Sequence, residues 1–372
     1  MKGTLTHSIK RNLPYRKLTQ GIQAIEKKIQ WSGTPSQYWK SICAMKAGLW
    51  HDDYFIDFKG FFDMEQDRKT LVLAIEYKRI KYGWTLDELL ELVESRAGKK
   101  HINHPSFCVL IASLFHEIGH FEKTLEFLPR ALSLKPDAID GYLGLSSFAL
   151  QQHLPAPCVH HENHEKLQLF FSRFQNFTAF FKNELSGKKI AVIGNGDSET
   201  GSSKGALIDS QDHVFRFNNF PEESMYEKDY GKKTTVWVRN PSIHEVPLRQ
   251  DFQPATIIFS SPLMLHTKNG NWKWILKHCN TDQNLVLFDV SVFRDLVQTL
   301  HAPPSAGLLA ICNIAELSDD LSHIHLQGFD FNTGQRSHYF DNQKPTSRHN
   351  WAAEKNVFSK ITERPVVYEN HR

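Results

Sequence analysis

The stretch Lys189-Ile-Ala-Val-Ile-Gly-Asn-Gly-Asp-Ser198 decides the fold of the second half of this 372-residue chain. Its apolar part, Ile190–Ile193, shows no polar alternation, which is typical of a strand covered on both faces of a parallel sheet. A glycine turn, Gly194-Asn-Gly196, follows this strand. Parallel sheets bind ligands beyond the carboxyl ends of their strands, so the turn is expected to face a ligand.

Five similar runs follow along the chain. They are rich in β-branched residues and are bounded by Gly, Asn or Asp: His213–Phe217, Thr235–Val238, Ala255–Phe259, Leu285–Phe288 and His323–Gln327. Helical segments such as Trp272–His278 and Leu308–Leu317 separate several of them, and an amphipathic helix over Leu167–Glu184 is expected before the first strand. Strands interleaved with helices predict an α/β domain with a parallel sheet.

The helical period dominates the chain before residue 152. Thr85-Leu-Asp-Glu88 is a capping box, which predicts the start of a helix over Leu86–Val93. Between Pro105 and Pro136 the pattern predicts a helical hairpin with Gly119 in its turn. The spacing resembles a tetratricopeptide repeat at Ala112, Phe115, Phe121 and Ala131, with a weaker copy at Tyr142, Leu145 and Ser146.

A polar stretch with two prolines interrupts the helical pattern after Gln152 and is typical of a linker. We therefore expect an N-terminal extension over residues 1–35, an all-α, tetratricopeptide-like domain over 36–152, a linker over 153–166 and the α/β domain over 167–372.

Composition and charge exclude several classes of protein. With 44 Lys and Arg against 41 Asp and Glu, the net charge of +3 argues against a nucleic-acid binder. The five scattered Cys have no CxxC spacing, which argues against a disulfide framework or a cysteine zinc site. No apolar run reaches the ~18 residues of a membrane span. An integral membrane segment is therefore not expected, and the expected location is the cytoplasm, with peripheral contact to the inner membrane as an option.

Two motifs resemble known binding sites, but the residues around them argue against those functions. His116-Glu-Ile-Gly-His120 matches the H-E-x-x-H zinc signature, but its glycine coincides with the predicted hairpin turn, so the two His would not share a helix face. The Gly194-Asn-Gly196 turn resembles the start of a dinucleotide fingerprint, but Glu199 stands where its third glycine belongs. Neither zinc nor NAD is therefore expected.

Four ordered blocks carry a resemblance to a known family. Residues 190–218, with Gly201, Asp209 and Arg216-Phe-Asn218, followed by Asp229-Tyr-Gly-Lys-Lys-Thr-Thr235, resemble the large sialyl motif of glycosyltransferase family 29, the eukaryotic-type sialyltransferases. Three further blocks are similar to that family's small motif, motif III and very small motif: Pro304-Ser-Ala-Gly307 with Ser318-Asp319 and Gly328-Phe-Asp-Phe331, His338-Tyr-Phe-Asp341, and His349-Asn-Trp-Ala-Ala-Glu354.

The resemblance implies a Rossmann-like, GT-A-type catalytic domain that moves a 2-keto sugar acid from a CMP-sugar to a glycan or glycolipid hydroxyl, with inversion. By the family's pattern, His349 is the base and His338 hydrogen-bonds the departing phosphate. The CMP-binding residues would be Gly194, Asn195, Gly196, Asn218, Ser305, Ala306, Gly307 and Tyr339, and the supporting residues Arg216, Asp209 and Glu354. The Asn amides can donate to phosphate and accept from ribose hydroxyls, and the Pro304-Ser-Ala-Gly307 helix start suits an anion.

Departures from the family pattern suggest a bacterial-type member. The first of two paired cysteines is absent and Ser318 stands at the second, as expected in a reducing cytosol. Gly196 replaces a Ser and Ala306 a Thr, which leaves sialic acid and Kdo open as the transferred sugar. No Asp-x-Asp follows a strand, so the expected reaction needs neither a metal nor a cofactor.

Two alternatives stay open beside a sialyltransferase of surface polysaccharide, capsule or lipopolysaccharide synthesis. One is a CMP-Kdo-dependent transferase of the same fold. The other is a binding scaffold, in which the helical repeats dock a protein partner and the CMP-binding domain is inactive.

Overall fold

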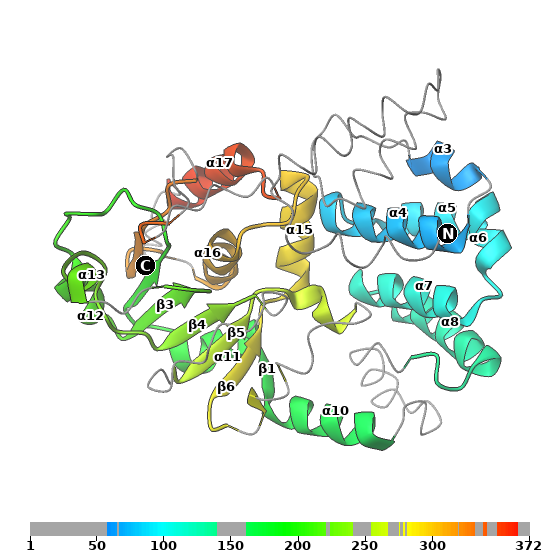
Figure 1. Cartoon of the computed structure of the whole chain (residues 1–372), viewed down its shortest axis with the longest axis horizontal. Coiled ribbons are helices and arrows are strands. Elements are labelled where there is room, and N and C mark those ends of the chain that lie inside the picture. The colour runs from blue at the N-terminus through cyan, green and yellow to red at the C-terminus, as the bar shows by residue number, and fades with distance from the viewer. Residues whose placement is uncertain are drawn as a thin grey trace, which may run out of the picture.

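The computed structural model describes residues 58–64, 67–139, 161–220, 224–240, 254–266, 275, 278–279, 281–318, 320–331, 338–340 and 348–363. Figure 1 shows a group of helices beside a twisted sheet, with helix α15 (Val290–Leu300) between them. The helical group consists of α3 (Phe58–Asp63), α4 (Arg68–Lys81), α5 (Leu86–Glu94), α6 (Arg96–His101), α7 (Pro105–Glu117) and α8 (Phe121–Leu134).

The predicted helix start at Thr85 is confirmed. The Thr85 side chain accepts from the Glu88 backbone N–H, and the Glu88 carboxylate accepts from the Thr85 N–H at 3.0 Å, so both orphan N–H groups are satisfied. The helix runs over Leu86–Glu94, as the amphipathic pattern predicts.

The predicted hairpin is also confirmed, as α7 and α8. Gly119 turns the chain between them with φ at +83°, a conformation that favours glycine. Ala112 and Ala131 are fully buried where the helices meet, and Phe115 stacks on Phe127 with ring centroids 5.7 Å apart. The weaker repeat copy at Tyr142, Leu145 and Ser146 lies outside the described residues, so the tetratricopeptide assignment stays a prediction.

All six expected strands are present in one parallel sheet, which confirms the α/β prediction. The six are β2 (Ile190–Ile193), β3 (His213–Phe217), β4 (Val236–Arg239), β5 (Thr256–Phe259), β6 (Asn284–Leu287) and β7 (Ile324–Gln327). The sheet also contains β1 (Phe174–Asn176), which was not expected. Their order is β1-β6-β5-β4-β3-β2-β7, and every pairing is parallel. The remaining elements are α10 (His161–Arg173), α11 (Phe177–Phe180), η2 (Phe181–Leu185), α12 (Gly205–Asp209), α13 (Ser224–Tyr230), η3 (Pro262–Leu265), α16 (Ala306–Leu317) and α17 (Trp351–Thr362).

The single helix expected over Leu167–Glu184 is wrong. Helix α10 begins at His161, inside the range expected as a linker, and ends at Arg173. The next three residues form β1, where Phe174 pairs with Leu285 of β6. Asn176 then caps α11 by accepting from the Ala179 N–H at 2.8 Å. The helix expected over Trp272–His278 lies largely outside the described residues.

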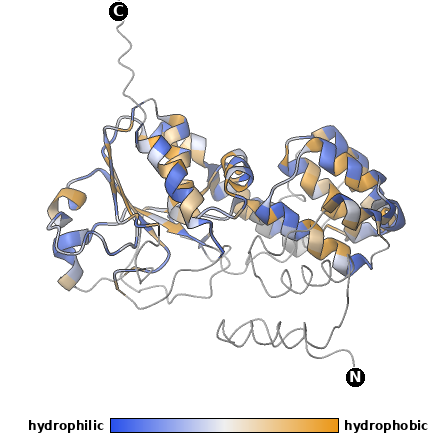
Figure 2. Ribbon diagram, turned by 90° about the horizontal axis from the view of Figure 1, so that it is seen from above, coloured by the Kyte–Doolittle hydropathy of each residue, from blue (hydrophilic) through white to orange (hydrophobic). Residues whose placement is uncertain are grey.

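The sheet has a different partner on each face. Trp237, Ile257 and Leu285 belong to the same buried cluster as helices α3–α8, whereas Val238, Ile258 and Val286 pack in the cluster of α15 and α16. Figure 2 shows the strands as largely apolar and the helices as amphipathic. The helical group therefore shares a core with the sheet, because burying one face of these strands requires that core.

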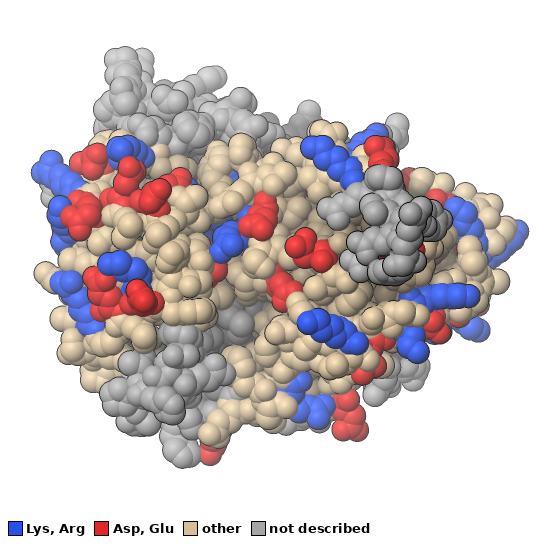
Figure 3. Space-filling view, turned by 180° about the vertical axis from the view of Figure 1, so that it is seen from behind, with Lys and Arg blue, Asp and Glu red and all other residues tan. Residues whose placement is uncertain are grey.

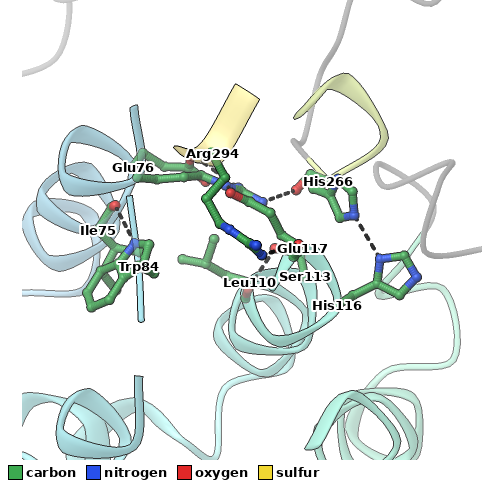
Figure 4. A network of polar contacts seen from close by, with 10 residues as sticks. Ile75, Glu76, Trp84, Leu110, Ser113, His116, Glu117, His266 and Arg294 are labelled. Atoms are coloured by element: carbon green, nitrogen blue, oxygen red, sulfur yellow. Dashed lines mark hydrogen bonds and ion pairs between the residues drawn. The ribbon is translucent and has the colours of Figure 1, made fainter. Parts of the chain in front are cut away.

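A buried polar network also joins the helical group to the loop after β5 (Figure 4). Arg79 of α4 donates from Nε to Glu117 Oε2 at 2.6 Å and from Nη2 to the His266 carbonyl at 3.2 Å. Arg294 of α15 donates to the Glu117 carbonyl at 3.5 Å. The side chains of Arg79 and Glu117 are 0% and 3% exposed, so two charges are held away from water and must compensate each other.

We expect Arg79→Met to lower the free energy of unfolding by about 3 to 5 kcal/mol, because it leaves the Glu117 carboxylate buried without its cation. The matched control is Lys59→Met, which breaks a 3.1 Å ion pair to Glu91 whose side chains are 72% and 57% exposed. The control should cost about 1 kcal/mol or less. Urea unfolding followed by tryptophan fluorescence measures both, and equal midpoints for the two variants would contradict the assignment.

Candidate functional site

The carboxyl end of β2 is the switch point of the sheet. Strand β2 lies between β3, which follows it in the chain, and β7, which returns on its other side. There the Gly194 N–H donates to the Gln327 carbonyl at 2.8 Å, and the Gly196 N–H donates to the Gly328 carbonyl at 2.9 Å. A Cβ at Gly194 would lie 2.2 Å from the Gly328 oxygen, so only glycine permits this approach. Crevices at such points are the usual ligand sites of parallel sheets.

Asn195 and Asn218 both lie at this edge, but each uses one end of its amide within the protein. Asn195 donates from Nδ2 to the carbonyls of Phe217 and Asn219, at 3.3 and 3.1 Å. Asn218 has a φ of +49° and accepts at Oδ1 from the Asn240 N–H at 2.9 Å. The two amides therefore lock the ends of β2, β3 and β4 together, and they present opposite atoms, Oδ1 and Nδ2, for further hydrogen bonds.

The start of α16 is the second wall of the candidate site. Ser305 caps this helix by accepting from the Leu308 N–H at 3.3 Å. A Cβ at Gly307 would lie 2.6 Å from the Phe329 ring, so α16 begins directly against the loop that follows β7. Ala306, the first residue of α16, adds no side-chain hydrogen-bonding group there.

Glu354 and His349 lie behind this helix start. Glu354 is fully buried and accepts from the Ser305 N–H at 2.8 Å and from the Ser305 hydroxyl at 2.6 Å. His349 Nδ1 lies 2.7 Å from the Pro303 carbonyl and 3.8 Å from Glu354 Oε1. The structure thus brings the predicted Ser305 together with His349 and Glu354, although Ser305 lies in a separate block of the sequence.

Burial is the main cause of the pKa shifts of His349 and Glu354. It lowers the pKa of His349 to about 4 and raises the pKa of Glu354 to about 7. Because both shifts favour uncharged forms, the 3.8 Å contact between the two side chains is not a strong ion pair near neutral pH. A carbonyl oxygen only accepts, so the proton of the neutral imidazole lies on Nδ1 and Nε2 carries a lone pair.

His338 and Tyr339 reach the site from a third segment. The Tyr339 N–H donates to the Asn195 carbonyl at 2.9 Å, and its ring stacks on Tyr230 with centroids 3.8 Å apart. The His338 ring stacks on Phe340 at 5.1 Å. The predicted motif III block is therefore anchored directly to the β2 turn.

The predicted supporting residues Arg216 and Asp209 hold the turn after α13. Arg216 donates to the carbonyls of Tyr230 and Gly231 at 2.6 and 2.9 Å, and Asp209 accepts from the Lys233 N–H at 2.8 Å. This turn places Tyr230, whose hydroxyl donates to the Gly196 carbonyl at 3.0 Å. No sequence pattern indicates this role of Tyr230, because the role depends on a ring stack with Tyr339, far along the chain.

The H-E-x-x-H motif is divided between two helices. His116 lies in the last turn of α7 and His120 precedes α8, while Glu117 is bound to Arg79. His116 Nδ1 instead lies 2.7 Å from His266 Nε2. Across the described part of the chain, no group of three or more His, Cys, Asp or Glu residues is placed to hold a metal ion.

The surface and the helices show two further properties. On the face shown in Figure 3, acidic and basic side chains intermix without a large patch of one sign. None of the helices within the described ranges combines the length and apolarity needed to cross a bilayer.

Comparisons with known proteins point to one family. Residues 146–300 match the model of glycosyltransferase family 29 (sialyltransferase). The chain is 25% identical over 302 residues to a type 2 lactosamine alpha-2,3-sialyltransferase of Homo sapiens, covering 72% of this chain and 85% of the relative. It is 27% identical over 213 residues to the human alpha-2,8-sialyltransferase 8E, covering 50% of this chain and 54% of the relative.

A crystal structure of a mammalian sialyltransferase also matches, with a TM-score of 0.41 and 19% identity over 59% of this chain and 82% of that chain. The family match includes the glycine turn after β2 and ends before α16. Residues 146–300 therefore carry the match to glycosyltransferase family 29, and together with the curated relatives they support a glycosyltransferase enzyme of the sialyltransferase type.

Proposed function

We propose that the chain transfers sialic acid from a CMP-sugar donor to a hydroxyl of a glycan, with inversion and without a metal ion. The family supports the reaction class, and curated relatives are named as sialyltransferases. The observation that carries the mechanism is the 2.7 Å contact of His349 Nδ1 with the Pro303 carbonyl. This contact fixes the proton on Nδ1 and leaves Nε2 as a base.

His349 is the proposed base for the acceptor hydroxyl. As the acceptor oxygen attacks the anomeric carbon, its proton passes to Nε2 of the neutral imidazole. Glu354 is a positioning residue, because its bonds to Ser305 join the start of α16 to the helix that follows His349.

The departing CMP needs partners for its phosphate, since the bond from the anomeric carbon to the phosphate oxygen breaks and its electron pair leaves with CMP. The free N–H groups of Ala306 and Gly307 at the start of α16 supply donors to an anion. Asn218 Nδ2 and His338 are proposed as further donors, with Tyr339 beside them, while Asn195 Oδ1 accepts from a ribose hydroxyl. Gly194 and Gly196 allow the backbone to approach the nucleotide.

The proposal also includes the class of acceptor and the cellular location of the reaction. We propose a surface polysaccharide, capsule or lipopolysaccharide glycan assembled at the cytoplasmic side of the inner membrane. The helical group, packed against α15 and the loop after β5, would border the acceptor side of the site or bind a protein partner.

A donor experiment separates the proposal from its two alternatives. The purified chain is incubated with CMP-Neu5Ac or CMP-Kdo in EDTA, with a mixed glycan acceptor, and CMP release is measured. Turnover of CMP-Neu5Ac alone supports the proposal, whereas turnover of CMP-Kdo alone favours a Kdo transferase. CMP binding without turnover of either donor favours the scaffold, and activity lost in EDTA and restored by a divalent ion refutes metal independence.

His349→Ala should reduce transfer at least about 100-fold, because a positioned general base contributes 10²- to 10⁴-fold. CMP affinity should change less than about threefold, because the base acts on the acceptor. The control is His120→Ala, an exposed His before α8. Steady-state kinetics and CMP titration test this, and a His349→Ala enzyme with wild-type kcat would refute the assignment.

The acid limb of kcat/KM should lie near pH 4, because burial lowers the pKa of His349 to about 4 and the neutral base persists down to that pH. His116, whose pKa burial also lowers to about 4, binds less proton in the folded than in the unfolded chain. The lowered pKa values of His116 and His349 should therefore reduce stability as pH decreases from about 6.5 to about 4, whereas the raised pKa of Glu354 acts in the opposite direction between about pH 7 and 4.5, so unfolding must be followed at each pH. An acid limb near 6.5 that persists in Glu354→Gln would contradict a neutral His349.

A further inference from the structure

Asp330 lies against the glycine turn of the candidate site, and the mechanism above does not use it. It follows β7 in Gly328-Phe-Asp330, and its Oδ2 accepts from the Ser198 N–H at 3.0 Å. The Ser198 hydroxyl donates to Oδ1. The carboxylate is therefore held over the loop that carries Gly196.

The contact with Gly196 is close enough to decide which residue can stand there. A Cβ at Gly196 would lie 2.5 Å from the carboxyl carbon of Asp330 and 2.5 Å from Oδ2. Sequence analysis identified Gly196 as the replacement of a family Ser, whose hydroxyl is lost. In this chain the carboxylate of Asp330 occupies the space that a side chain at position 196 would need, so an oxygen acceptor is still present beside the turn.

The charges around Asp330 limit which part of the donor can lie there. Burial raises the pKa of the Tyr230 hydroxyl to about 12, and the charges of Asp330, Asp197 and Asp229 act in the same direction. This edge of the crevice is therefore negative. The donor's phosphate and sugar carboxylate are anions, which the Asp330 carboxylate repels, whereas the free N–H groups at the start of α16 attract them.

An ionised carboxylate has about four lone-pair sites and accepts well from hydroxyl groups, so the contacts of Asp330 with Ser198 are compatible with a further bond from a ligand hydroxyl. Vicinal ribose hydroxyls are a common partner of an acidic residue at the end of a strand in parallel sheets. We propose that Asp330 accepts a hydrogen bond from the ribose diol of the CMP moiety. This inference rests on the proposed function, and it orients the donor with its ribose over Gly196 and its phosphate toward α16.

The test is a titration of the full chain with CMP, 2′-deoxy-CMP and 3′-deoxy-CMP by calorimetry. The variants are Asp330→Asn and Asp330→Ala, and the control is Asp320→Asn, a carboxylate that lies before β7 and accepts from the Ser322 N–H at 2.8 Å and from the Ser322 hydroxyl at 2.5 Å. Wild type should bind CMP roughly 10- to 100-fold more tightly than at least one deoxynucleotide, as expected for a hydrogen bond to a charged group.

In Asp330→Ala this preference should fall below about threefold through weaker CMP binding, while the control keeps the wild-type ratio. Asp330→Asn keeps an acceptor for the Ser198 N–H, so it reports the loss of charge if Asp330→Ala fails to fold. An unchanged ratio in a folded Asp330 variant, or no preference in wild type, overturns the inference alone. A wild-type chain that binds no CMP overturns the proposed function, and this inference with it.

Discussion

The buried ion pair between Arg79 and Glu117 lies within the helical group, and the contacts of these two residues with His266 and Arg294 join that group to the region of the sheet. Burial raises the pKa of Glu117, and the Arg79 charge opposes that shift, so each group needs the other to remain charged inside the protein. The same guanidinium also binds the His266 carbonyl after β5. Separating the helical group from the sheet would expose both charges and open a shared apolar core. The helices are therefore part of the support of the catalytic sheet.

The strands were predictable because a parallel sheet buried on both faces needs short apolar runs, and all six expected runs became strands. Strand β1 was not predictable. Phe170, Phe174, Phe177 and Phe181 recur at the spacing of a helix face, yet Phe174–Asn176 pairs with β6. Local periodicity carries no information about an edge strand whose partner lies more than a hundred residues later. In this segment tertiary pairing decided the structure.

The candidate site was predictable in its residue types but not in its orientations. The blocks resembling the family named Asn195, Asn218, Ser305 and His349, and the structure places them around the ends of neighbouring elements. Which amide atom each Asn presents depends on backbone groups of the next strand, and no sequence pattern specifies that. The block similar to the small motif contains Asp330, but its position beside the glycine turn was not predictable, because its partner Ser198 lies 132 positions away.

The polarity of the crevice explains how a nearly neutral protein can handle a dianionic donor. The net charge is +3, so attraction cannot come from a general positive field. The Asn218 amide and the free N–H groups that begin α16 form a wall of neutral donors, while Asp330 contributes a carboxylate beside the glycine turn. Because fixed dipoles need no reorganisation when charge develops on the leaving phosphate, such a wall stabilises the transition state more than the ground state. The Asp330 carboxylate also favours one orientation of the donor, because a donor bound the other way round would place its phosphate next to this carboxylate.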